Sequence, residues 1–178
     1  MQFLRARIAV PAVLAALTLA ALPLTASAQE MPARKAGLWQ ITTSGTTGAN
    51  KNPEQVMQQC VDTASDQALQ KMGSGMMNNM KCEKNENKKD GNKYTGHAIC
   101  QMGPSKMESK SVTSGDFEKE YTMTADSTFN PPMAGISSSK SVMVAKWVGP
   151  CKADQKPGDV IVNGQKMNLL NMGQPQKK

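Results

Sequence analysis

The sequence predicts a mainly β protein: an antiparallel meander or partly open barrel-like sheet with one short helix, stapled by disulfides. Segments with a period of two, rich in Val, Thr and Ser, follow one another across short turns. No helices alternate with these segments, which argues against a parallel α/β sheet. The chain of 178 residues has four cysteines, an even number that fits two disulfides in an oxidising compartment.

Residues 1–28 are predicted to be a signal peptide. Arg5 and Arg7 precede an apolar stretch over residues 8–24, and Ala26-Ser27-Ala28 is a small-x-small cleavage signature. This stretch is the chain's single candidate membrane span, and no cysteine lies near Ala28 to carry a lipid. We therefore expect a bacterial periplasmic protein with no transmembrane segment after cleavage.

Charge does not identify a partner. The chain carries 21 Lys+Arg against 14 Asp+Glu, and losing the two arginines of the signal peptide lowers the net charge from +7 to +5. The lysines concentrate near residues 81–93, where acids interleave with them and Tyr94 is the local aromatic residue. Nucleic acid binding is therefore not expected.

The mature chain begins with an irregular segment and then one predicted strand. Residues 37–43 alternate in the β manner, with Trp39 on one side. Residues 44–52, rich in Gly, Ser, Thr and Asn, indicate a loop, and residues 53–60 remain ambiguous between a helical turn and a strand.

One short helix is predicted over residues 64–72. Thr63 and Asp66 are spaced as in a capping arrangement at its start. Gly73 and Gly75 follow it and weaken the helical pattern.

A hairpin is predicted around Gly91, with strands over residues 81–88 and 93–101. Cys82 and Cys100 are equidistant from this glycine, so a hairpin sets them opposite each other or one step out of register. Four cysteines allow three connectivities, and this geometry favours Cys82–Cys100. The remaining pair is then Cys60–Cys151, which ties the N-terminal part to the C-terminal part.

Further strands are predicted over residues 106–113, 117–125 and 138–148, with Asn130-Pro131-Pro132 as a break. In the last strand, Val142, Val144 and Val148 lie on one face and Met143, Ala145 and Trp147 on the other.

The domain organisation that follows is a single β-rich domain over residues 29–158. Residues 159–178 are a C-terminal extension, in which 159–162 can form a short hairpin turning at Asn163-Gly164 before a tail expected to be disordered.

The chain lacks a recognisable catalytic constellation, so we expect no enzyme activity and no cofactor. His97 is the single histidine, and no nucleophile elbow lies near it. Ser137-Ser138-Ser139-Lys140 matches S-x-x-K by letters alone, and Glu118 and Glu120 read as part of a solvated face. With one histidine and no C-x-x-C, a conventional metal site is not predicted.

Methionine offers the one metal alternative. Met72, Met76 and Met80 fall at i, i+4 and i+8 with Met77 beside them, and soft thioethers on one face can hold Cu(I). Methionine is also an adaptable core filler in a chain with few aromatics, as its spread over the whole sequence suggests. A copper-handling periplasmic protein is therefore the alternative function.

The order of these motifs resembles the domain-of-unknown-function 3617 family of small exported bacterial proteins. An opening of the type Pro-x-x-x-Gly-Leu-Trp is matched, one residue longer, by 32–41, which holds Gly37 and Trp39. The further matches are Gln59-Cys60, the Cys82 to Cys100 hairpin with Gly91-Asn92, and Gly149-Pro150-Cys151. The resemblance covers about residues 32–151 and implies a β-rich periplasmic domain, with no activity, ligand or catalytic residue to carry over.

Structural roles are expected for Gly37, Trp39, Gly91 and Trp147. The leading hypothesis is a non-enzymatic periplasmic binding or envelope-associated module. Its sheet would offer a groove or edge to a small apolar ligand or to an envelope protein.

Overall fold

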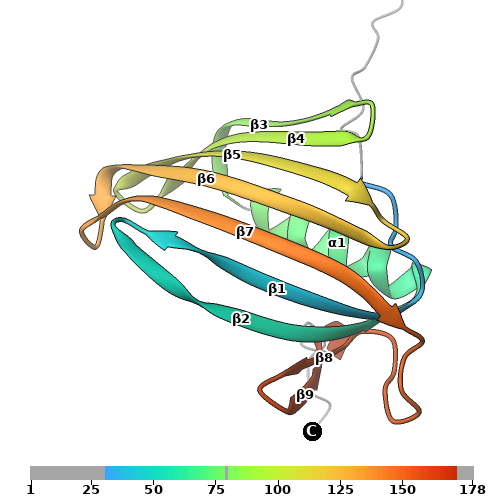
Figure 1. The fold of residues 1–178 in the computed structure, drawn as a ribbon. Coiled ribbons are helices and arrows are strands. Elements are labelled where there is room, and N and C mark those ends of the chain that lie inside the picture. The colour runs from blue at the N-terminus through green and yellow to red at the C-terminus, as the bar shows by residue number, and fades with distance from the viewer. Residues whose placement is uncertain (1–30, 79, 172–178) are drawn as a thin grey trace, which may run out of the picture.

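The computed structural model describes residues 31–78 and 80–171, so the predicted signal peptide lies outside the described residues. One open antiparallel sheet has the strand order β3-β4-β5-β6-β7-β1-β2-β8-β9, and helix α1 lies across one of its faces (Figure 1). The mainly β class with one helix is thereby confirmed. The elements are β1 (Gly37–Thr47), β2 (Asn50–Val61), α1 (Thr63–Asn78), β3 (Lys81–Asp90), β4 (Lys93–Met102), β5 (Ser105–Asp116), β6 (Glu120–Met133), β7 (Ile136–Gly149), β8 (Asp159–Val162), β9 (Gln165–Asn168) and the 3-10 turn η1 (Leu169–Asn171).

The loop predicted over residues 44–52 is wrong, because β1 runs to Thr47 and β2 begins at Asn50. Threonine favours strands, so the turn is confined to Gly48, with φ +58°, and Ala49. Gly45 lies at a shift in the β1–β2 register, where its missing Cβ lets the Lys140 backbone of β7 approach closely. The ambiguous residues 53–60 belong to β2.

Helix α1 is longer than predicted, because Gly73 and Gly75 lie within it. Its first turn is capped one residue earlier than expected. The Ser65 N–H donates to Asp62 Oδ1 at 2.7 Å, and the Asp62 N–H donates to Ser65 Oγ at 2.8 Å. Each glycine costs a helix about 1 kcal/mol, a penalty that tertiary packing routinely overrides.

The hairpin predicted around Gly91 is confirmed as β3 and β4. Gly91 has φ +59°, the left-handed conformation that a tight turn needs, and a Cβ at this position would meet no neighbouring atom. Cys82 pairs directly with Cys100 across the two strands, next to a register shift.

The break predicted at Asn130-Pro131-Pro132 does not end β6. The strand continues to Met133, which pairs with Ile136, while the ladder with β7 is irregular after Thr128. Proline removes a ladder donor without removing the extended backbone, so it interrupts pairing rather than the strand. At the other end, Phe117 to Lys119 form the turn before β6 instead of its beginning.

The sheet extends beyond residue 158. Strand β8 pairs with β2, and β8 and β9 form the short hairpin expected around Asn163-Gly164. The described part of the C-terminal extension therefore supplies the last two strands at one edge, and residues 172–178 lie outside the described residues.

The hydrophobic core lies between α1 and one face of the sheet, which we call the helix face. Trp39 and Ala145 are fully buried there, beside Tyr121, and Leu69 of α1 packs against them. The strand register places the even-numbered residues of β1, such as Thr42, on the opposite face, which we call the open face. As the alternation predicted, Met143 and Ala145 lie on one face of β7 and Val142 and Val144 on the other.

Candidate functional site

Residues far apart in the sequence meet at one corner of the sheet, where β1 begins and β2 and β7 end. Gly37 has φ +135°, and a Cβ there would overlap both the Gly149 carbonyl oxygen and the Trp147 indole. Trp39 is buried beside Tyr121, with 5.8 Å between their ring centroids. These residues build the packing of the corner, where a side chain larger than hydrogen at position 37 does not fit.

A buried ion pair that the sequence analysis missed lies beneath this corner. The Arg34 guanidinium is 2.7 Å from Asp66 Oδ1, and the Arg34 backbone N–H donates to Asp66 Oδ2 at 2.8 Å. Arg34 also donates to Gln59 Oε1 at 2.9 Å, and Gln70 donates to Asp66 Oδ2 at 3.0 Å. Both charges are therefore fully engaged within the protein, as buried charges must be.

Tyr121 closes this cluster on the sheet side. Burial raises the pKa of its phenol, an effect that the neighbouring Arg34 charge partly opposes. A phenol that stays neutral beside a paired arginine is a packing and hydrogen-bonding group, and it offers no base or nucleophile near pH 7.

The two tryptophans hold the segment that precedes β1. Trp39 Nε1 donates to the Lys35 carbonyl at 2.8 Å, and Trp147 Nε1 donates to the Ala36 carbonyl at 3.1 Å. The Lys35 N–H donates to the Phe117 carbonyl at 3.0 Å. These hydrogen bonds hold the backbone of residues 35 and 36 against the sheet.

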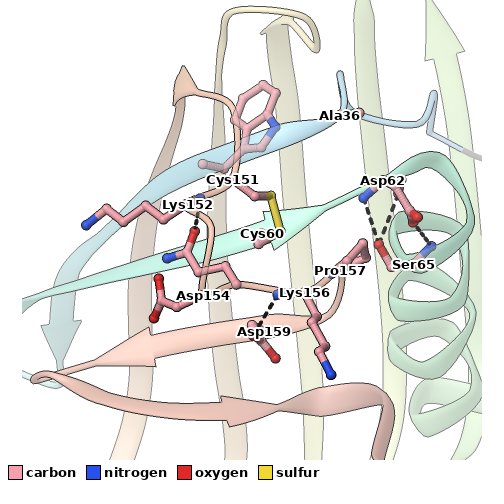
Figure 2. Close-up of a disulfide and its surroundings, with 12 residues drawn as sticks. Ala36, Cys60, Asp62, Ser65, Cys151, Lys152, Asp154, Lys156, Pro157 and Asp159 are labelled. Carbon is pink, nitrogen blue, oxygen red and sulfur yellow. Dashed lines mark hydrogen bonds between the residues drawn. A yellow bond between two sulfur atoms is a disulfide. The ribbon is translucent and has the colours of Figure 1, made fainter.

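One disulfide closes the corner on the open face. Cys60 of β2 bonds Cys151, which follows β7, and Figure 2 shows this bond joining β2 to the segment that leads to β8. The Gly158 N–H donates to the Cys60 carbonyl at 2.9 Å, so the crossing segment is fixed at both ends. Near it, the Lys156 N–H donates to Asp159 and keeps the pKa of that carboxyl below its ordinary value.

The second disulfide, Cys82–Cys100, lies in the hairpin at the other edge of the sheet. These are the two pairings that the sequence favoured, and the described residues contain no free cysteine. A surface depression of about 220 Å³ beside Cys82 is lined by Lys81, Glu83 and Gln101. Its volume is below the range of about 300–1,000 Å³ that is usual for a small-molecule site.

The residues weighed for catalysis lie on different elements of the sheet. His97 lies 2.9 Å from Glu108, a carboxylate on the next strand, and that carboxylate also contacts Lys110 at 3.1 Å. Lys140 is engaged in an ion pair with Asp126 at 3.1 Å. Glu118 lies in the turn before β6, so it does not share a strand face with Glu120.

The proposed copper ligands are only partly described. Met72 lies on α1 with 42% of its surface exposed, and Met80 is half-buried just before β3. The side chains of Met76 and Met77 are outside the described part, so a four-methionine site stays a prediction. Within residues 31–78 and 80–171, no group of three His, Cys, Asp or Glu side chains could hold a metal ion.

The open face carries a surface that the sequence analysis did not assemble. Two adjacent rows of uncharged residues cross the open face, and we call them the Val/Thr band; the first row runs from β2 to β5, where Lys93 of β4 continues it, and the second runs from β1 to β4. The first row contains Val56, Thr42, Val144, Thr122 and Ser114, and the second contains Ser44, Val142, Thr124, Val112 and Thr95.

Charged residues border the Val/Thr band on both sides. On one side Lys146 of β7 faces Glu120 of β6 at 3.8 Å, and on the other Lys140 faces Asp126. Val56 and Val112 are 46% and 40% exposed. No helix or strand of the described residues lies over this band, as Figure 1 shows with α1 behind the sheet. An exposed apolar centre with a charged rim is typical of a protein interaction surface.

Comparison with known proteins gives a family and no activity. No curated protein and no solved structure matches the chain. No helix among the described residues is long and apolar enough to cross a membrane. The two disulfides fit an extracellular or periplasmic protein. The family described as "Protein of unknown function (DUF3617)" matches residues 34–151, from the buried Arg34 to Cys151, and the chain belongs to that family.

Proposed function

We propose that this protein is a non-enzymatic interaction module of the bacterial periplasm, which binds a protein surface through the Val/Thr band. The observation that carries the proposal is the uncovered band itself, which places four valines in two rows between ion-paired flanks. A soluble domain ordinarily uses such β-branched residues to bury a face, and here the helix covers the other face.

Two further observations support a binding role. The buried charges at the corner satisfy one another, so neither charge is available to a substrate. The depression beside Cys82 is smaller than the clefts that usually hold small ligands, which favours a protein partner over a small apolar ligand.

Site-specific photo-crosslinking in the periplasm tests the proposal. A photoreactive amino acid replaces Val112 in one variant of the chain and Met167 in another, because these side chains have nearly equal exposure, 40% and 41%, on β5 and β9. We expect protein adducts from position 112 and none from position 167. The adduct at 112 should disappear when Val142→Lys places a charge in the middle of the band.

Mass spectrometry then identifies the adduct. Absence of any adduct at 112, or an adduct that survives Val142→Lys in a protein that remains folded, would contradict the use of this face. Retention of both disulfides and an unchanged far-UV circular dichroism spectrum show that the variant is folded.

A further inference from the structure

The charged rows that border the Val/Thr band are arranged so that the open face complements itself. On both borders the lysine lies on β7 and the acid on β6: Lys146 beside Glu120, and Lys140 beside Asp126. The two acid-lysine pairs therefore repeat with the same polarity along the strands. This repetition decides which symmetric pairings of two copies are electrostatically favourable.

A two-fold axis parallel to the strands, between β6 and β7, would place β7 of one copy over β6 of the other. Each row then faces the same row in reverse order, so Lys146 lies over Glu120 of the second copy and Lys140 over its Asp126. In the centre, Val144 and Val142 meet the threonines of β6. Each lysine of the two pairs meets an acid, and no like charges of these pairs are superimposed.

The other in-plane axis, perpendicular to the strands, gives the opposite result. It keeps β7 over β7 and exchanges the two borders, so Lys146 lies over Lys140 and Glu120 over Asp126. Juxtaposed like charges disfavour a complex. The charge pattern thus selects the strand-parallel axis, and both axes keep the strands of the two sheets aligned, as in face-to-face β-sheets about 10 Å apart.

The size of the face is adequate for such a pairing. Six strands about 4.8 Å apart, with seven residues per strand about 3.4 Å apart, outline roughly 700 Å². A standard stable interface buries about 800 Å² on each partner. The band and its two charged borders are therefore comparable to one half of a standard dimer interface.

We infer that the Val/Thr band is the interface of a symmetric homodimer, in which a second copy of this chain stacks face to face on the six strands from β4 to β2. The inference rests on the proposed use of the open face for binding and names its occupant. In this dimer the open face of each sheet packs against the open face of the other, as the two layers of a β-sandwich do.

Paired charge-reversal variants test this arrangement by sedimentation equilibrium. One variant combines Lys140→Glu with Lys146→Glu, and the other combines Glu120→Lys with Asp126→Lys. Alone, each places like charges opposite each other in the dimer, and we expect its dimer Kd to rise at least tenfold. An equimolar mixture restores opposite charges at all four positions, and we expect a heterodimer with nearly the Kd of the unmodified protein.

This rescue separates contacts between copies from the ion pairs within one chain, because neither variant regains its internal pairs in the mixture. From the mature net charge of +5, the variants carry +1 and +9, so overall charge does not attract them to each other. The control Lys71→Glu with Lys89→Glu has the same +1 charge, with changes on α1 and on the helix face of β3, and should dimerise normally.

A chain that stays monomeric up to ~0.1 mM would overturn the inference, as would a dimer that both charge variants leave intact. If either double variant fails to fold, a variant that reverses all four charges replaces it. This variant again places opposite charges across the homodimer, so we expect it to dimerise, and a monomer would contradict the arrangement. A monomer that still gives the Val112 adduct with another protein retains the proposed function and loses only the homodimer.

Discussion

The two disulfides hold regions of opposite character. Cys60–Cys151 joins residues 91 apart in sequence at a corner where Trp39 and Cys60 are completely buried. Cys82–Cys100 joins residues 18 apart in a hairpin whose strand β3 is mostly exposed. The first crosslink fixes a non-local arrangement of β1, β2 and β7, whereas the second closes a turn that local pairing already defines.

The residues that carry the resemblance to the family divide between the two regions, and those around Cys82, Gly91 and Cys100 lie in the hairpin. Gly37, Trp39, Gln59 and Cys151 gather at the corner, and their contacts there are packing, a buried ion pair and backbone clamping. Residues with contacts of this kind stabilise the fold. The proposed binding surface is elsewhere, in strand residues without a recognisable motif.

The charge of the hairpin has a structural explanation as well. β3 is an edge strand, and lysines and acids along it interact within the sheet, as Glu86 does with Lys84 at 3.5 Å and with Lys88 at 3.6 Å. Charged side chains on an edge discourage other strands from pairing with it. This role accounts for the lysines without a nucleic acid partner.

Removing each disulfide should give the largest losses of unfolding free energy, and the two losses should show which crosslink stabilises the protein more. Loop lengths of 91 and 18 residues correspond to stabilisation of about 4.6 and about 3.2 kcal/mol. We expect Cys60→Ala with Cys151→Ala to lower the free energy of unfolding in urea more than Cys82→Ala with Cys100→Ala, by about 1.4 kcal/mol. Equal losses of unfolding free energy in the two variants would contradict the ranking that the loop lengths predict.

The second largest difference is expected between the ion pairs of the two regions, in the stability that each provides. Asp66→Ala leaves the Arg34 guanidinium buried without its anion, and breaking a buried pair in this way costs about 3–5 kcal/mol. Glu86→Ala removes an exposed partner of two lysines and should cost less than about 1 kcal/mol. Thermal unfolding of the two variants makes the comparison, and a similar loss for both would contradict the assignment of Asp66 to the corner's core.

Periodicity was sufficient to predict most strands, the hairpin and both pairings, because alternation and the distance from Gly91 are local properties. The Arg34–Asp66 pair escaped prediction because its members are 32 residues apart and neither lies in a distinctive pattern. The Val/Thr band also escaped it, since ordinary threonines and valines become a surface only when the register of six strands aligns them.

The smallest expected effect concerns acid. At the corner, the Ser65 backbone N–H and then its hydroxyl hold the pKa of Asp62 below 3.8. Toward the hairpin edge, Lys110 and then His97 lower the pKa of Glu108, whose ordinary value is 4.5. A lowered folded pKa means that each carboxylate stabilises the fold above its ordinary pKa, and that this contribution is lost as pH falls through the folded value.

Salt should separate the two carboxylates. Asp62→Ala should cost about 1 kcal/mol near pH 7 through the lost cap, with a loss that shrinks below pH 3.8 and changes little in 0.5 M NaCl. Glu108→Gln should have a smaller effect that disappears in the same salt, because exposed charge pairs are screened. Urea titrations between pH 2 and pH 7 at low and high salt measure both. If salt removed the effect of Asp62→Ala, charge attraction rather than the helix cap would be the cause of the pH dependence of stability at this corner.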